Sequence, residues 1–167
     1  ELYSLEPSTG KTTGEEQVLL RGSGFVEGMT VRFGEAEAGT VFIVSSETAS
    51  VTTPANFPGL ATVRIAHPDG RSYEKVDGFL YYNEVSITEV DPAFGPTTGG
   101  MPVVISGSGF APESHLIIGD TEAIGVQVLD DNTILAITPQ GSNGSKDVYV
   151  SNSKGIGRLT DGYKYFA

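Results

Sequence analysis

Short stretches of apolar residues, several of them alternating with polar residues, run through the second half of the chain. Residues 85–90 and 103–106 have the two-residue period of β-strands that bury one face. Similar stretches follow at short, regular spacing: residues 115–119, 123–129, 134–138, 147–152 and 162–166. No window of about 11 residues shows the 3.6-residue period of an α-helix. About seven antiparallel strands at these intervals predict an immunoglobulin-like β-sandwich.

Glycine, proline and acidic residues separate these strands. Pro92 cannot donate a backbone hydrogen bond, so the first strand should end there, and the glycine-rich residues 95–100 should form a connection. The two glycines of Gly107-Ser108-Gly109-Phe110 permit a sharp bend, after which Phe110 can turn inward and cover one end of the sandwich. Turns are predicted at residues 130–132, 141–144 and 153–155, and a turn should also precede the last strand at residues 162–166.

The first half of the chain contains the same pattern 85 residues earlier. The residues that recur at this offset are Pro7, Gly10, Thr12, Thr13, Gly14, Val18, Gly22, Ser23, Gly24, Phe25, Gly34, Glu37, Ala38, Thr53, Pro54, Val63 and Gly70. Asp77-Gly78 corresponds to Asp161-Gly162 at an offset of 84, so one residue is lost in the turn before the last strand. Most of these residues determine turns and cores. We therefore predict two domains of one fold, residues 1–82 and 83–167.

The second copy resembles a known family. The motifs that carry the resemblance are Pro92, Gly95-Pro96-Thr97-Thr98-Gly99-Gly100, Gly107-Ser108-Gly109-Phe110, Thr138-Pro139 and Asp161-Gly162-Tyr163-Lys164-Tyr165. They resemble the IPT/TIG family, whose immunoglobulin-like fold occurs in plexins, Rel-type transcription factors, bacterial surface proteins and carbohydrate-active enzymes. The first copy differs at Lys11, where the family prefers proline, and at Glu15-Glu16-Gln17. The resemblance implies an all-β chain of two tandem sandwiches; it implies no activity, since the family shares no catalytic set.

The charge of the chain limits its partners. Residues 1–82 contain 11 acids and 6 bases (−5), and residues 83–167 contain 10 and 4 (−6), which together give the net charge of −11. Such a protein is repelled by nucleic acid and by anionic membrane surfaces. No stretch approaches the ~20 apolar residues of a membrane span. The first residues have no targeting pattern, so we expect a mature or excised piece.

Few residues of the chain are suited to chemistry. Cysteine is absent, which excludes disulfides, thiolate metal sites and thiol catalysis. We expect the two histidines, His67 and His115, at the surface, and we expect no catalytic residue, metal or cofactor. The glycines of residues 22–28 are interpreted as a turn, because no helix follows to complete a dinucleotide site. Calcium binding by acidic turns such as residues 130–132 remains an alternative.

The two copies differ at positions that alternation directs outward. In the first copy these positions are Leu19, Arg32, Ser50, Thr52 and Arg64; their equivalents in the second copy are Val104, Ile117, Leu135, Ile137 and Tyr149. Val104, Leu135 and Ile137 should share the outer face of one sheet, and Ile117 and Tyr149 that of the other. Apolar clusters on adjoining strands mark contact surfaces more often than scattered apolar residues do. We predict that these five residues of the second copy bind a partner.

These observations favour a non-catalytic structural or adhesion module at the cell surface or outside the cell. The connection between the copies, residues 83–84, is short and lacks glycine and proline, so the pair should form a semi-rigid spacer. Its partner would be a protein, either another surface protein or a second copy in a filament. The alternative is an accessory pair of a glycan-binding or polysaccharide-degrading protein, although the chain has no tryptophan to offer to sugar rings.

Overall fold

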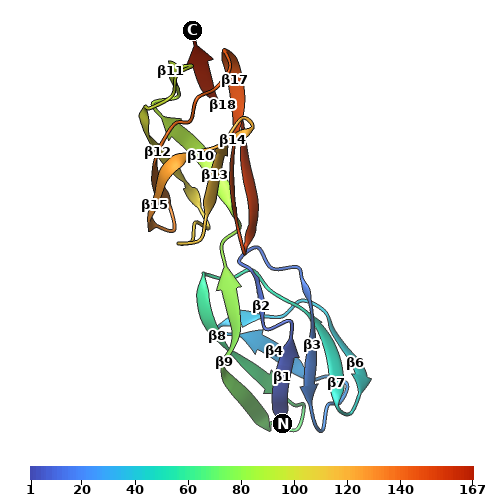
Figure 1. Ribbon diagram of the computed structural model, residues 1–167. Helices are drawn as coiled ribbons and strands as arrows, with labels where there is room; N and C mark the ends of the chain where they lie inside the picture. The colour runs from blue at the N-terminus through green and yellow to red at the C-terminus, as the bar shows by residue number, and fades with distance from the viewer. The chain divides into compact units, whose positions relative to one another are not determined.

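The computed structural model describes all 167 residues, and the chain folds into two compact units. Unit 1 comprises Glu1–Tyr82 and unit 2 comprises Asn83–Ala167. Each unit consists of β-strands and their connections, arranged as two sheets (Figure 1). No helix of the length and apolarity needed to cross a membrane is present. The all-β fold of two tandem immunoglobulin-like sandwiches is therefore confirmed.

Unit 1 contains a four-stranded and a five-stranded sheet. The four-stranded sheet has the order β1 (Leu2–Glu6), β3 (Gln17–Gly22), β7 (Thr48–Thr52) and β6 (Val41–Ser45). The five-stranded sheet has the order β2 (Thr9–Lys11), β9 (Ser72–Tyr82), β8 (Gly59–Ala66), β4 (Thr30–Phe33) and β5 (Ala36–Glu37). Strand β3 buries every second residue, which is the period expected when one face of a sheet covers a core.

Unit 2 repeats this topology strand for strand. Its four-stranded sheet has the order β10 (Ser86–Asp91), β12 (Pro102–Ser108), β16 (Thr133–Ile137) and β15 (Ile124–Asp130). Its five-stranded sheet has the order β11 (Phe94–Pro96), β18 (Gly155–Phe166), β17 (Gly144–Asn152), β13 (His115–Ile118) and β14 (Thr121–Glu122). The shared strand order explains why the residues that form turns and cores recur at a constant offset.

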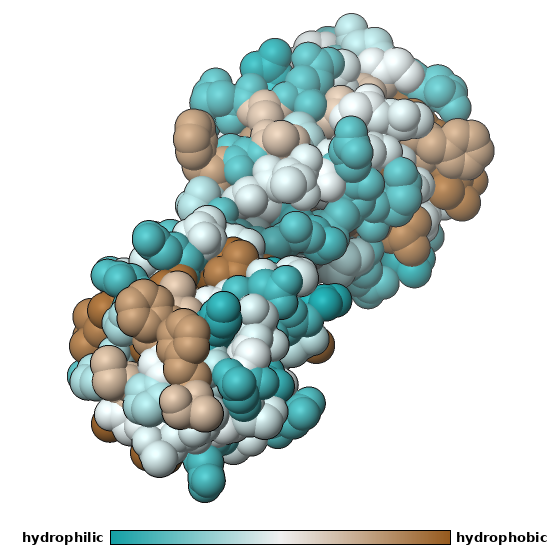
Figure 2. All heavy atoms as spheres, turned by 90° about the horizontal axis from the view of Figure 1, so that it is seen from above, coloured by the Kyte–Doolittle hydropathy of each residue, from teal (hydrophilic) through white to brown (hydrophobic).

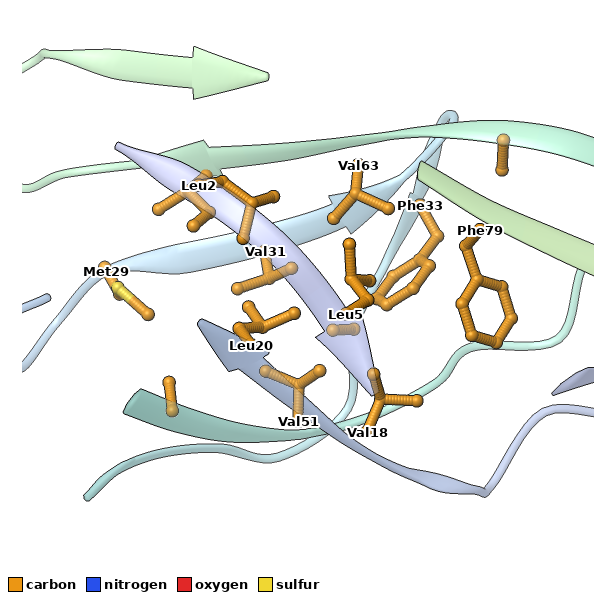
Figure 3. Packing of buried hydrophobic residues seen from close by; sticks show 14 of the residues in the cluster. Leu2, Leu5, Val18, Leu20, Met29, Val31, Phe33, Val51, Val63 and Phe79 are labelled. Atoms are coloured by element: carbon orange, nitrogen blue, oxygen red, sulfur yellow. The ribbon is translucent and has the colours of Figure 1, made fainter. Parts of the chain in front are cut away.

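The core of unit 1 lies between its two sheets. Figure 3 shows Leu5 of β1, Leu20 of β3, and Val31 and Phe33 of β4 pointing toward one another. A separate cluster in unit 2 includes Ile105, Leu116 and Ile134, all fully buried. Each unit thus has its own hydrophobic core, as an independently folding domain requires.

Aromatic rings close the ends of both cores. Phe25 and Phe110 are 3% and 2% exposed, which confirms that these equivalent rings turn inward after their glycine bends. Near the other end, the hydroxyl of Tyr81 donates to the carbonyl oxygen of Pro54 at 3.0 Å, and that of Tyr165 to Pro139 at 2.7 Å. Burial raises the pKa of both phenols to about 12. The rings are therefore fixed to the opposite loop by neutral hydroxyl groups.

Two features differ from the prediction of seven antiparallel strands. The connection at residues 95–100 contains part of a short strand, β11, which pairs in parallel with the end of β18; β2 and β9 form the same pair in unit 1. No turn directly precedes Asp161-Gly162. These residues lie within β18, where Asp161 has a φ of 52° and the register with β17 shifts between Lys146 and Val148. The last hairpin of each unit is consequently longer than predicted.

Replacing Phe110 with alanine should lower the free energy of unfolding of unit 2 by roughly 3–5 kcal/mol, because the ring leaves a cavity at the end of the core. Denaturant unfolding would measure this loss. Phe94→Ala is the matched control, since Phe94 belongs to the same unit but is 59% exposed and should cost little. Equal losses in the two variants would contradict the assigned role of Phe110.

Candidate functional site

The outer face of the four-stranded sheet of unit 2 carries an apolar surface. Val104 on β12 lies opposite Leu135 on β16, and Pro102 lies opposite Ile137. Ile137 in turn lies opposite Ile124 on β15. These five residues, from three neighbouring strands, are called the apolar face below. Val104 and Ile137 are 38% and 39% exposed, Ile124 is 59% exposed, and Leu135 is partly buried among them.

Unit 1 has a polar network at the same positions. Gln17, Ser50 and Thr52 are the equivalents of Pro102, Leu135 and Ile137. The amide nitrogen of Gln17 donates to the hydroxyl oxygen of Thr52 at 2.7 Å, and the hydroxyl of Ser50 donates to the amide oxygen of Gln17 at 3.0 Å. The fold therefore accepts a hydrogen-bonded, solvated surface here, so the apolar residues of unit 2 are not a requirement of the sandwich.

Ile124 belongs to the apolar face, although the sequence did not single it out. Simple alternation along residues 123–129 would put Ile124 on the inner face with Val126 and Val128, which pack against the core. The register of β15 shifts between Ile124 and Gln127, however, and Ile124 is exposed. The shift occurs at Gly125, whose φ of 60° favours glycine. A glycine inside a predicted strand is the one sequence signal that such a bulge was present.

The sheet that bears the apolar face contains acids and no bases. Its strands carry Glu89 and Asp91 on β10 and Asp130 on β15, but no lysine or arginine. The four bases of unit 2 are Lys146, Lys154, Arg158 and Lys164, all in the β17–β18 hairpin. A partner of the apolar face would therefore meet apolar side chains with carboxylates at their margin. Figure 2 shows similar small groups of apolar residues among hydrophilic ones at the surface of the protein.

The second predicted contact face, Ile117 and Tyr149, has a different character. The two residues lie opposite each other on β13 and β17, and both are partly buried. The guanidinium carbon of Arg158 lies 5.8 Å from the centre of the Tyr149 ring, and the Tyr149 hydroxyl bonds to the Asp147 carboxylate at 3.3 Å. Tyr149 is thus held by neighbours within unit 2. Partner binding by any of the five predicted residues remains a prediction.

Asp147 organises this polar group. Its carboxylate accepts a hydrogen bond from the backbone nitrogen of Asp161 at 2.9 Å and another from Arg158. The bond from Asp161, assisted by Arg158, lowers the pKa of Asp147 below its ordinary value of 3.8. Unit 1 has the simpler ion pair Arg64–Glu74, 3.0 Å apart, at the positions of Tyr149 and Arg158. The cluster therefore stabilises the bulge of β18, where Asp161 adopts a left-handed conformation.

The structure offers no arrangement suited to metal binding: no three side chains among His, Asp and Glu are placed to hold an ion. His115 is exposed, as expected, and its Nδ1 lies 2.8 Å from Glu122. The expectation for His67 was wrong, because that side chain is only 7% exposed, its ring packs against Tyr73, and neither ring nitrogen has a hydrogen-bond partner. His67 continues the inward alternation of Ala61, Val63 and Ile65, a signal that the sequence did contain.

An open cleft lies at the same place in each unit. In unit 1 a cleft of about 500 Å³ includes Phe57, Leu60, Arg64 and Glu74 in its lining. Phe57 is 87% exposed, and its loop is held by Asn56, whose side chain bonds to the Phe33 carbonyl oxygen and to the Phe57 nitrogen, both at 2.9 Å. The cleft of unit 2, about 540 Å³, has Ser142 where unit 1 has Phe57. The exposed aromatic ring is therefore particular to unit 1, because Tyr165, which lines the cleft of unit 2, is fully buried.

Asp147→Asn should lower the melting temperature of unit 2 at neutral pH, because charge-assisted hydrogen bonds to Asp161 and Arg158 are weakened. The pKa of Asp147 is lower in the folded than in the unfolded state. Its contribution is therefore present above the unfolded value and is lost as the pH falls through the folded value. Calorimetry of the parent and the variant should show a difference that shrinks below pH 3.8. The exposed Asp120→Asn is the charge-matched control; an equal loss there would contradict the role of Asp147.

The comparisons with known proteins agree with this architecture. The model of the IPT/TIG domain family matches residues 1–81 and 86–166. Human fibrocystin-L is 24% identical over 167 residues, which cover 98% of this chain but only 4% of the length of fibrocystin-L.

Two solved structures show the same fold. A C-terminal fragment of intimin, solved with the intimin-binding domain of the translocated intimin receptor, has a TM-score of 0.54 and 14% identity over 96% of this chain and 62% of the fragment. The plexin A4 extracellular region has a TM-score of 0.50 and 15% identity over 99% of this chain and 15% of the plexin. Because the family model covers both units, the chain belongs to the IPT/TIG domain family, of which it contains two tandem copies.

Proposed function

We propose that this tandem pair is a non-catalytic module of an extracellular or cell-surface protein, a spacer whose second unit contacts another protein through the apolar face. The observation that carries the proposal is the replacement of the Gln17, Ser50 and Thr52 network by Pro102, Leu135 and Ile137. The replacement changes a solvated surface and leaves the buried side of the same strands apolar in both units.

The apolar face gains free energy when a partner excludes water from it. An apolar side chain left in water contributes nothing to stability, whereas burying each one against a partner contributes roughly 1.5–3 kcal/mol. Two or three such side chains, surrounded by near-neutral contacts, are enough for a modest interface. The acids Glu89, Asp91 and Asp130 lie in the same sheet and favour a partner that carries basic residues around an apolar centre.

The spacer role is supported by the connection between the units. Strand β9 ends at Tyr82 and β10 begins at Ser86, so only residues 83–85 lie between the last strand of one unit and the first strand of the next. Neither glycine nor proline occurs among them. We expect such a short connection to restrict independent motion of the two units.

A location outside the cell is supported by the occurrence of this family in plexins and bacterial surface proteins, together with the acidic composition of the chain. The partner is another surface protein or a second copy of this chain. In the second case, a contact between the apolar face and a different surface of the next copy would build an open filament.

A second candidate function, glycan binding, rests on one observation, the exposed Phe57 beside the cleft of unit 1. An aromatic face next to charged side chains is suited to a sugar ring. If this function operates, the protein is retained on an insoluble polysaccharide and Phe57→Ser, which introduces the residue type of unit 2, abolishes retention. The exposed Val76→Ser is the control. Equal retention of parent and Phe57→Ser would exclude the cleft as a glycan site.

Restoring the polar surface should abolish partner binding. The triple variant Pro102→Gln, Leu135→Ser and Ile137→Thr gives unit 2 the residue types of unit 1 at these positions, so its fold and melting temperature should be retained. The tagged protein, applied to cells of its source, should be retained at the cell surface, and the variant should lose most of that retention.

The matched control is the double variant Ile117→Arg and Tyr149→Arg, which places the residue types of Arg32 and Arg64 on the other sheet. Loss of retention in the control alone would show that the contact lies on the β13–β17 face. Retention of both variants at the level of the parent would show that neither face is the contact surface.

A further inference from the structure

The edges of the four sheets are protected from pairing with other strands, with one exception. An edge strand presents unpaired backbone groups, and proteins prevent unwanted pairing with short strands, charges, proline or bulges. Strands β5 and β14 have two residues each, and β2 and β11 have three, with Lys11 in one and Pro96 in the other. Strand β1 carries Glu6, and β10 carries two acids and a register shift.

Strand β6 lacks most of these devices. Its residues, Val41–Ser45, include no charge, proline or glycine, and its only register shift lies between Ile43 and Ser45, at its end. Val41 and Ile43 pack against the core, while Phe42 and Val44 are 63% and 58% exposed on the outer side. The regular part of β6 is therefore apolar on both faces at an open sheet edge.

The equivalent edge of unit 2 is protected. Strand β15 has a second register shift, a left-handed Gly125, and Asp130 at its end. The position of Phe42 is occupied there by Gln127. The same fold has a protected edge in unit 2. The topology therefore does not require the edge at β6 to be open.

We propose that β6 is a pairing edge at which two copies of this chain associate, with their β6 strands antiparallel about a twofold axis at Phe42. In this arrangement Phe42 faces its own counterpart on the outer side, and Val41 faces Ile43 of the second copy on the core side. The pairing joins two four-stranded sheets into one continuous sheet. Aromatic and β-branched cross-strand pairs of this kind stabilise sheets.

The absence of charged residues in β6 favours a second copy of this acidic chain as the partner at this edge. Unit 1 is acidic, and two copies repel wherever carboxylates come face to face. Pairing β1 with itself would bring Glu6 into the contact, and pairing β10 or β15 with itself would bring Glu89, Asp91 or Asp130. Strand β6 is the edge longer than three residues at which two acidic copies meet without opposing charges in the strands.

The test is the mass in solution, measured by sedimentation over about a thousandfold range of concentration, because an interface between two strands is small and therefore weak. The mass of the parent should rise from 17.5 kDa toward twice that value. Phe42→Lys should remain monomeric at every concentration, because two ammonium groups would lie directly opposite each other. Phe42 is 63% exposed, so the variant should keep the melting temperature of the parent.

Gln127→Lys is the matched control, with the same introduced residue at the equivalent position of unit 2, and it should associate like the parent. Hydrogen exchange provides a second measurement: those amides of residues 41–43 that point away from β7 should gain protection as concentration rises. A parent that stays monomeric, or Phe42→Lys associating like the parent, would overturn the proposal. Association lost in the Pro102, Leu135 and Ile137 variant but kept in Phe42→Lys would also overturn it, while supporting the apolar face as a contact between copies.

Discussion

The packing of the two sheets in each unit depends on aromatic rings that lie directly against glycine backbone. A side chain at Gly22 would place its Cβ 2.6 Å from Cζ of Phe25, and one at Gly107 would approach Phe110 to 2.7 Å. Neither ring can move without opening the end of a core in which it is almost fully buried. The backbone oxygens of Glu1 and Ser86 lie closer still, 2.1 and 2.0 Å from a Cβ at these positions. Ring and backbone together therefore require glycine in each copy, while the surrounding surface has changed.

Much of the fold was predictable because burial of one sheet face imposes a two-residue period. Strands β3, β12 and β16 show that period in their own residues. The parallel pairs of β2 and β11 were not predictable in this way, because three residues are too few to show a period and pair through their backbones. The continuity of β18 was hidden by Asp161-Gly162, residue types that favour a turn but here form a bulge closed by Asp147.

The candidate site was predictable as far as it depends on comparing equivalent positions. Leu135 and Ile137 stood out because unit 1 has Ser50 and Thr52 there, whereas Val104 has the apolar Leu19 as its equivalent. The structure places all three on one sheet face. Ile124 was missed, since a bulge carries it out of simple alternation. Likewise, the sequence could not show that Arg158 and Asp147 engage Tyr149, because these contacts depend on which residues of two strands lie opposite each other.

The parallel pairing of β2 with β9, and of β11 with β18, determines how each unit responds to mechanical force. Tension applied to the two ends of a unit pulls β2 toward its own beginning and β9 toward its own end. The strands would have to slide along each other, so the hydrogen bonds that join Thr9–Lys11 to the end of β9 bear the load together. A ladder loaded in shear resists extension more than one opened from its end, a property suited to a module held between two anchored points.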